Sequence, residues 1–162
     1  MIAAFGLALV AFISTAQNTP CINGQVVEVE HGRDYILHIC GVGKVALRGV
    51  EPPLRIADGL PITGGTASGE LLGGKNIAPD AVEFLSRVVG QRVTLVYDGW
   101  RIGDREGRRY AYVFLPDKAF LNAQMIQRGY GYADRQGSHP RRDEFIALEA
   151  AARRSKVGVW AS

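Results

Sequence analysis

Residues 24–40, GQVVEVEHGRDYILHIC, alternate apolar and polar side chains on both sides of His31-Gly32-Arg33. Alternation of this kind is typical of strands with one buried face, and a short polar turn with glycine between two such runs predicts a β-hairpin. The next segment, KVALRGV at 44–50, predicts a third strand. The folded part of the chain is therefore expected to start with three consecutive strands.

Beyond residue 77 the pattern changes to helix. Pro79 suits a first helical turn, Asp80 and Glu83 complement the helix dipole, and Gly90 ends the apolar stripe. Further elements are expected in the order strand, strand, helix, helix, at 92–98, 109–115, 119–127 and from Arg141 or Asp143 onward. A chain of 162 residues suits one domain. The order predicts a mainly β fold with α, a five-stranded barrel of OB type with three helices.

The N-terminus is typical of a signal peptide. Residues 2–13 are apolar or small, and Ser14-Thr15-Ala16 suits cleavage after Ala16. The stretch is shorter than the roughly 20 residues that span a bilayer. Residues 1–16 therefore predict a secreted or periplasmic protein, with a retained membrane anchor as the alternative. The mature chain is expected to begin with an N-terminal segment at 17–23 and to contain no membrane span.

Cys21 and Cys40 flank the predicted hairpin. In an oxidising compartment they are expected to form a disulfide, which stabilises a fold by roughly 2–4 kcal/mol. The alternative is that both remain reduced. Four ligands at zinc-site spacing are absent from the sequence, so a zinc site is not expected.

The remaining sequence features are compatible with more than one role. A glycine-rich loop is predicted at 54–77, and the net charge of +3 permits a polyanionic partner without requiring one. Several aromatic residues suit either stacking on single-stranded nucleic acid or barrel packing, and packing is preferred. They are Trp100, Tyr110, Tyr112, Tyr130 and Tyr132.

Five segments in order resemble the staphylococcal-nuclease-like (SNase-like, thermonuclease) family over residues 24–160. They are VVEVEHGRDYIL, VALRGVEPP, APDAVEFLSRVVGQRVTLV, DREGRRYAYVFLPDKAFLNAQMIQRGYGYA and EFIALEAAARRSKVGVW. The resemblance implies an OB-fold barrel with three helices. It also implies a site that hydrolyses phosphodiesters of DNA and RNA with Ca²⁺, because active members use a calcium ion, two arginines and a glutamate.

Part of that site is present in this chain. The resemblance places Arg108 on a catalytic, phosphate-binding arginine, with Arg109 beside it as a second phosphate contact. It places Glu51 on one calcium carboxylate. The other metal position falls on Arg33, or on Asp34 if one residue is inserted in the turn.

Two family residues are missing. Ala46 stands where the family has its other arginine, and Leu54 stands where it has the glutamate. Arg48, two residues along from Ala46, is a candidate to replace the arginine. Asp58 or Glu70 in the glycine-rich loop is a candidate for the missing acid.

Three functions follow as expectations. The first is an exported protein with a degenerate nuclease site, serving as an accessory or binding protein in the envelope or in exopolysaccharide (succinoglycan-type) biosynthesis. The second is a Ca²⁺-dependent phosphodiesterase that uses Asp34, Glu51 and Arg108. The third is a metal-free OB-type module that binds nucleic acid. Whether the chain is an enzyme depends on whether other residues replace the missing two.

Overall fold

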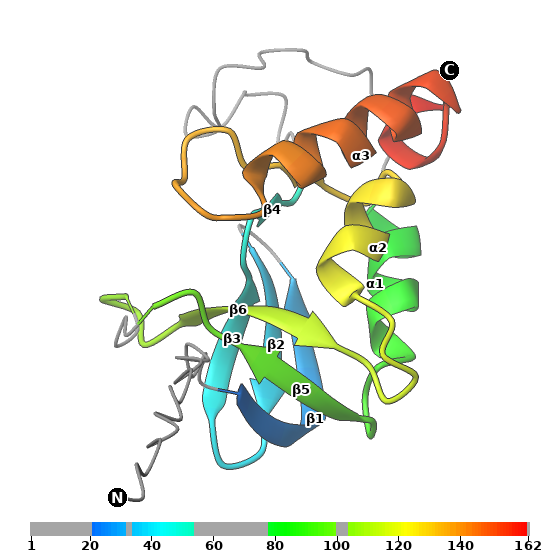
Figure 1. Cartoon of the computed structure of the whole chain (residues 1–162). Coiled ribbons are helices and arrows are strands. Elements are labelled where there is room, and N and C mark those ends of the chain that lie inside the picture. The colour runs from blue at the N-terminus through cyan, green and yellow to red at the C-terminus, as the bar shows by residue number, and fades with distance from the viewer. Residues whose placement is uncertain (1–20, 32–33, 54–77, 100–103, 162) are drawn as a thin grey trace, which may run out of the picture.

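Five strands close into a barrel in the order β1-β2-β3-β6-β5 (Figure 1). The computed structural model describes residues 21–31, 34–53, 78–99 and 104–161. The barrel strands are β1 (Cys21–His31), β2 (Tyr35–Ile39), β3 (Gly43–Leu47), β5 (Arg92–Val96) and β6 (Arg109–Phe114). The predicted hairpin is confirmed as β1 and β2, and the expected barrel with three helices is also confirmed.

Strand β1 closes the barrel because it pairs with two neighbours. Its first half, Cys21 to Gln25, pairs antiparallel with β5, and its second half pairs antiparallel with β2. A register shift between Val26 and Glu28 separates the halves. Bulges of this kind bend a strand and increase its twist, so one strand can serve both neighbours.

The third strand is shorter than the sequence predicted. β3 ends at Leu47, the chain turns at Arg48 and Gly49, and a separate strand β4 (Val50–Glu51) follows. Gly49 has a φ of 76°, which a residue with a side chain rarely adopts. β4 pairs with β7 (Tyr132–Ala133) in a small second sheet that the sequence did not reveal.

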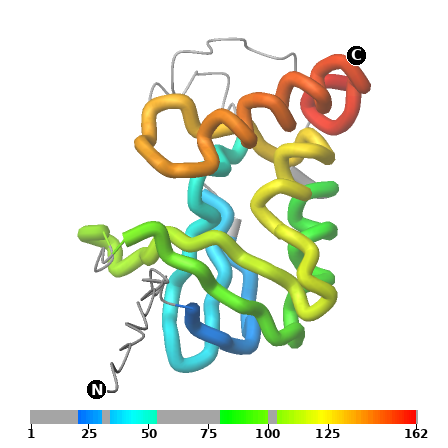
Figure 2. The backbone as a smooth tube through the Cα atoms, in the orientation of Figure 1, coloured from blue at the N-terminus to red at the C-terminus, as the bar shows by residue number. Residues whose placement is uncertain are grey.

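Three helices pack on the barrel (Figures 1 and 2). α1 (Ala78–Ser86) and α2 (Leu121–Gln127) lie along one side, and α3 (Arg142–Arg154) crosses one end above β4. A short 3-10 helix η1 (Gly158–Trp160) follows α3. No helix in the described ranges is long and apolar enough to cross a membrane. The predicted signal peptide and the 54–77 loop lie outside the described residues.

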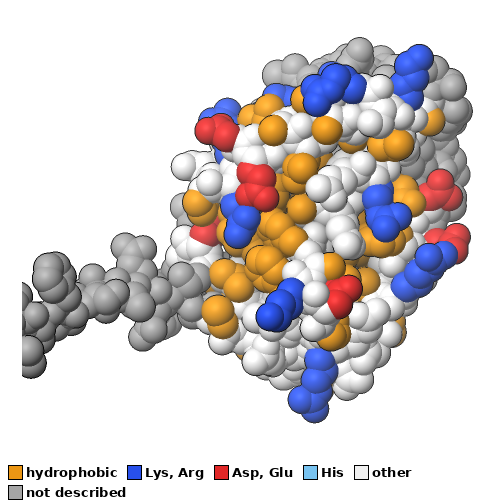
Figure 3. Space-filling view, turned by 45° about the vertical axis from the view of Figure 1, so that its right-hand side comes forward, with side chains coloured by type: hydrophobic (Ala, Val, Ile, Leu, Met, Phe, Trp, Pro, Cys, Tyr) orange, Lys and Arg blue, Asp and Glu red, His pale blue; other side chains and the backbone are white. Residues whose placement is uncertain are grey.

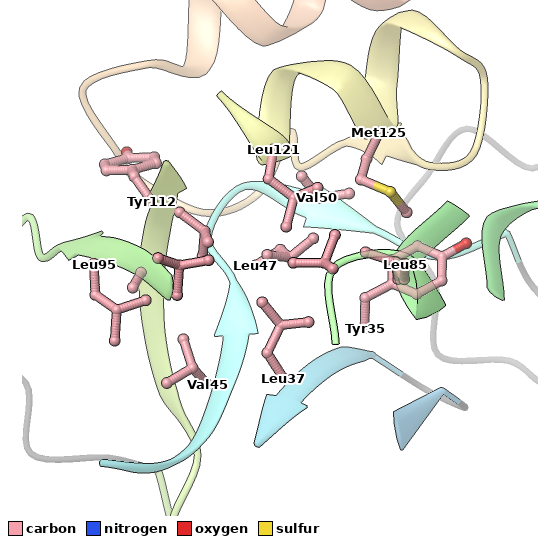
Figure 4. Close-up of a cluster of buried hydrophobic side chains, with 14 of the residues drawn as sticks. Tyr35, Leu37, Val45, Leu47, Val50, Leu85, Leu95, Tyr112, Leu121 and Met125 are labelled. Carbon is pink, nitrogen blue, oxygen red and sulfur yellow. The ribbon is translucent and has the colours of Figure 1, made fainter. Parts of the chain in front are cut away.

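The core fills the barrel and the space between barrel and helices (Figure 4). Strand residues alternate, so Leu37, Val45 and Leu47 point inward. Leu85 of α1 and Met125 of α2 complete the cluster from outside the sheet. Full burial of an aliphatic side chain is worth about 1.5–3 kcal/mol, so these contacts hold the helices on the barrel.

One fully buried polar side chain joins three elements of the fold. Asn122 of α2 accepts a hydrogen bond from the Val113 amide (2.9 Å) and donates to the carbonyls of Arg48 (2.9 Å) and Ala111 (3.2 Å). It therefore ties the end of β3 and strand β6 to helix α2. Without it the buried Val113 amide and the part-buried Arg48 carbonyl would lose a partner, whereas the Ala111 carbonyl also accepts from the Arg48 amide (2.9 Å).

The predicted disulfide is wrong in the structure, where Cys21 and Cys40 are both exposed and outside any disulfide. The Cys40 amide donates to the Gln25 carbonyl (2.9 Å), so Cys40 lies beside Gln25, four residues along β1 from Cys21. At about 3.3 Å per residue the two cysteines are ~13 Å apart. A disulfide needs Cα atoms within about 7 Å.

We expect Asn122→Ala to lower the free energy of unfolding by about 2–4 kcal/mol, because it leaves buried backbone groups unpaired. Urea unfolding measures this. Asn23→Ala is the matched control, since exposed Asn23 only accepts a hydrogen bond from the Thr94 hydroxyl. Equal losses in the two variants would contradict the role given to Asn122.

We also expect Cys21 and Cys40 of the folded chain both to react with a thiol reagent without prior reduction. Mass spectrometry after alkylation under native conditions measures this. A Cys21→Ser variant should leave one reactive thiol at Cys40. A chain that takes up alkylating agent only after reduction would contradict the observed register.

Candidate functional site

The loop before β6 is built around one carboxylate. Asp104 accepts hydrogen bonds from the amides of Glu106 (2.9 Å) and Arg108 (2.9 Å). Its own amide donates to the Arg108 carbonyl (2.8 Å), and Gly107 turns the chain with a φ of 73°. Asp and Gly favour such turns because Asp bonds to nearby amides and Gly tolerates positive φ. The loop fixes Arg108 at the start of β6.

The guanidinium of Arg108 is surrounded by carboxylates. Its Nε donates to Asp104 Oδ2 (2.7 Å), its Nη1 donates to Asp34, and its Nη1 lies 3.3 Å from Glu106 Oε2. The Arg108 side chain is only 12% exposed. Three carboxylates face one cation, so the cluster as a whole is negatively charged. We call Asp34, Asp104, Glu106 and Arg108 the arginine cluster.

The pKa values in the cluster reflect these contacts. Burial raises the pKa of Asp104, but hydrogen bonds from Arg108 and from the Glu106 amide outweigh it and leave the pKa lowered. Burial lowers the pKa of Arg108, but the hydrogen bond to Asp104 and the electrostatic contributions of Tyr110, Asp34 and Asp104 together outweigh it, so the pKa is raised. Burial and then the Asp34 charge raise the pKa of Tyr110. Asp104 and Arg108 therefore stay ionised, and Tyr110 stays neutral, around pH 7.

Ala46 lies on the same face of the sheet as the arginine cluster. In the sheet it is paired with Ile36 of β2 and with Tyr110 of β6, and paired residues have their side chains on the same face. The Tyr110 hydroxyl is 3.4 Å from Asp104 Oδ2, so this face is the one that holds the cluster. The position where the family has an arginine therefore offers a buried methyl group.

The structure places Arg48, the proposed substitute, in a different set of contacts. Arg48 lies in the turn after β3, and its Nε donates to Asp98 (3.0 Å) while its Nη2 donates to the Ser138 carbonyl (2.9 Å). Its side chain is 20% exposed. Each of these bonds would have to break for Arg48 to bind a phosphate beside Arg108.

The other predicted site residues are scattered or undescribed. Glu51 lies on β4, paired with Tyr132 of β7. Arg109 is exposed at the start of β6. Arg33, Leu54, Asp58 and Glu70 lie outside the described residues. The structure therefore brings Asp34 and Arg108 together, and Arg48 into a separate ion pair.

The residues described do not fit a calcium ion, although the family in general depends on calcium. Ca²⁺ takes six to eight oxygen ligands. In the described ranges, no three His, Cys, Asp or Glu side chains are grouped as a metal site requires. The carboxylates of Asp34, Asp104 and Glu106 face the guanidinium of Arg108 instead.

Two acids of these networks were missed from the sequence. Glu106 lies between Arg105 and Arg108 in the DREGRR segment, and no sequence motif marks it. Asp98 lies two residues after the end of β5 and is part of no recognisable motif. The predicted packing role of Tyr112 is confirmed, because Tyr112 is buried in the core.

We expect Asp104→Asn to destabilise the fold in a pH-dependent way. The lowered pKa means that the carboxylate contributes stability above its ordinary value of 3.8 and loses it as the pH falls through the lower folded value. The variant should therefore be less stable than the parent at pH 7, and the difference should shrink at about pH 3. Urea unfolding at both pH values measures it.

The control for that comparison is Glu83→Gln, which breaks an ion pair with Arg87 whose two side chains are 68% and 71% exposed. Exposed pairs contribute little, so this variant should match the parent at both pH values. A stability difference for Asp104→Asn that is the same at pH 7 and pH 3 would contradict the charge-based account.

Comparison with known proteins agrees with the fold. A model of the family described as staphylococcal nuclease homologue matches residues 62–162. No curated protein matches the chain. The matched part contains Arg108 and its loop, whereas Ala46 and Glu51 precede it. Because the match spans more than half of the sequence and the barrel and helices agree with it, the chain belongs to the staphylococcal nuclease homologue family.

Proposed function

We propose that this chain is a family member that no longer hydrolyses phosphodiesters and acts as a binding or accessory protein. The observation that supports this most directly is the state of Arg108. Its guanidinium already contacts Asp34, Asp104 and Glu106. A phosphate that approached Arg108 would meet one positive charge and three negative ones, so the net interaction would be repulsive.

The missing residues point the same way. Ala46 supplies no hydrogen-bond donor, and loss of one pre-organised donor typically lowers a rate by about 10²–10³. Leu54 in the sequence supplies no base, and loss of a general base lowers a rate by about 10²–10⁴. If the two losses multiply, hydrolysis would be slower by about 10⁴–10⁷.

Export and an envelope or exopolysaccharide (succinoglycan-type) role form part of this proposal. Residues 1–16, with their apolar stretch and Ser14-Thr15-Ala16, support export. The exopolysaccharide role is drawn by analogy with SNase-like proteins of similar size, and it rests on the fold alone. The corresponding ligand would be a carbohydrate or another protein.

Binding of nucleic acid is a weaker candidate on the surface visible in Figure 3. On that face the Lys and Arg side chains are separated from one another, and several have Asp or Glu beside them. Nucleic-acid surfaces usually carry a continuous basic strip. The face in Figure 3 shows no such strip among the described residues.

The test is cleavage of single-stranded DNA and RNA by the full chain, with Ca²⁺ and with a chelator. We expect no cleavage above the chelator blank from a chain that circular dichroism shows to be folded. Arg108→Ala and Glu51→Ala should be indistinguishable from the parent. An active nuclease of the same family serves as the positive control for substrate and metal.

Calcium-dependent cleavage by the parent chain, lost in both variants, would contradict the proposal. It would mean that other residues replace the missing arginine and glutamate. Single-stranded DNA that binds without cleavage, insensitive to chelator and weakened steeply by salt, would favour the nucleic-acid-binding module instead.

A further inference from the structure

His139 is a buried histidine outside the arginine cluster. It lies in the segment between β7 and α3, residues 134–141, which we call the docking loop. The residue is 7% exposed, and its Nδ1 lies 3.2 Å from the hydroxyl of Tyr112. Its Nε2 is buried and has no hydrogen-bond partner. The ring also packs against Phe145 of α3, with ring centroids 5.5 Å apart.

The docking loop is held on the turn between β3 and β4. A Cβ atom on Gly49 would lie 2.6 Å from His139 Cε1 and 2.8 Å from Nε2, so the imidazole lies directly against the Gly49 backbone. The Asp134 amide donates to the Gly49 carbonyl (3.0 Å), and Arg48 donates to the Ser138 carbonyl (2.9 Å). Three adjacent contacts therefore hold the docking loop on this turn.

Only a neutral imidazole fits this position. If Nδ1–H donates to the Tyr112 hydroxyl, Nε2 carries only a lone pair. A buried lone pair without a partner costs less free energy than a buried N–H without one. Burial raises the pKa of Tyr112 to about 12, so its hydroxyl stays protonated and can serve as partner. A protonated ring would place a positive charge in a buried site and add an N–H at Nε2, which has no hydrogen-bond partner among the described residues. The Asp134 backbone offsets only part of this cost.

The charged groups around His139 offset only part of the cost of adding a proton. Arg48 adds positive charge from the β3–β4 turn, and Arg141 at the start of α3 lies over the Tyr112 ring. Two carboxylates are near, but both are engaged. Asp98 accepts from Arg48 (3.0 Å), and Asp134 accepts from the amides of Gln136 and Gly137. Burial and then the Arg48 charge lower the pKa of His139.

We infer that the docking loop is a pH-dependent element, seated on the Arg48–Gly49 turn when His139 is neutral and released when the ring takes up a proton. Release would also free the neighbouring β4–β7 pair, because Asp134 follows β7 directly and bonds to the residue before β4. This goes beyond the proposed function and does not depend on it.

The direction follows from proton linkage. The pKa of His139 is below its ordinary value of 6.5 in the folded chain, so the open or unfolded state binds the proton more readily. Stability is then full above pH 6.5 and falls as the pH drops toward the lower folded value. For one proton, the opening constant rises by at most about tenfold per pH unit.

The experiment compares amide hydrogen exchange of the full chain at pH 7.5 and 5.5. We expect the protection factor of the Asp134 amide to fall several-fold at pH 5.5, and to be equal at both pH values in His139→Gln. His38→Gln is the matched control. His38 pairs with Glu30 on the exposed face, so that variant should keep the fall in protection.

A proton titration of the His139 ring by NMR tests the wild-type chain directly, without relying on a variant that folds. We expect its midpoint below 6.5. A midpoint at or above 6.5 would overturn the inference. An acid-induced loss of Asp134 protection that persists in His139→Gln would overturn it as well.

Discussion

The parallel pairing of β3 with β6 is the contact on which both the barrel and the site depend. It joins Val45, Ala46 and Leu47 to Arg109, Tyr110 and Ala111, and it links the first three strands to the last two. The same register sets Ala46 beside Tyr110 and brings the start of β6 close to Asp34, the residue before β2. Arg108 thus reaches Asp34 across the sheet. The β3–β6 register therefore contributes to closing the barrel and also brings Arg108 to Asp34.

Two arginines near the strand ends, Arg108 and Arg48, are each engaged in ion pairs within the fold. Arg108 is enclosed by three carboxylates, and Arg48 by Asp98 and a backbone carbonyl. Both side chains are mostly withdrawn from solvent. Charge-assisted bonds of this kind hold loops in place, and they leave little capacity for an anionic ligand. In this chain both arginines therefore act as structural ties between loops.

Much of the fold was predictable because the alternation of apolar and polar residues in strands and the residues that begin and end helices are local signals. The β1–β2 hairpin, the helix before Gly129 and the presence of a helix before Gly90 follow from residues close in sequence, although α1 ends at Ser86, short of Gly90. The two-residue strands β4 and β7 carry too few residues for a pattern. The disulfide prediction was wrong because spacing along the chain says nothing of register, and the pairing of Cys40 with Gln25 separates the cysteines. The family resemblance assigned Arg108 to the site and left Arg33 and Asp34 as alternatives for one metal position. The contact of Arg108 with Glu106 depends on the turn at Gly107, which no motif marks.

The central claim is that the guanidinium of Arg108 is held by its own carboxylates and is not offered to a phosphate. The most direct measurement is the NMR signal of the Arg108 Nε–H, assigned by comparison with Arg108→Lys. A guanidinium locked to Asp104 should give a slowly exchanging Nε–H resonance near neutral pH. The account predicts that this resonance stays unmoved when Ca²⁺ and a phosphodiester dinucleotide are added together. A shift or loss of the resonance on that addition would show that Arg108 leaves its carboxylates for the ligand, and would contradict the account.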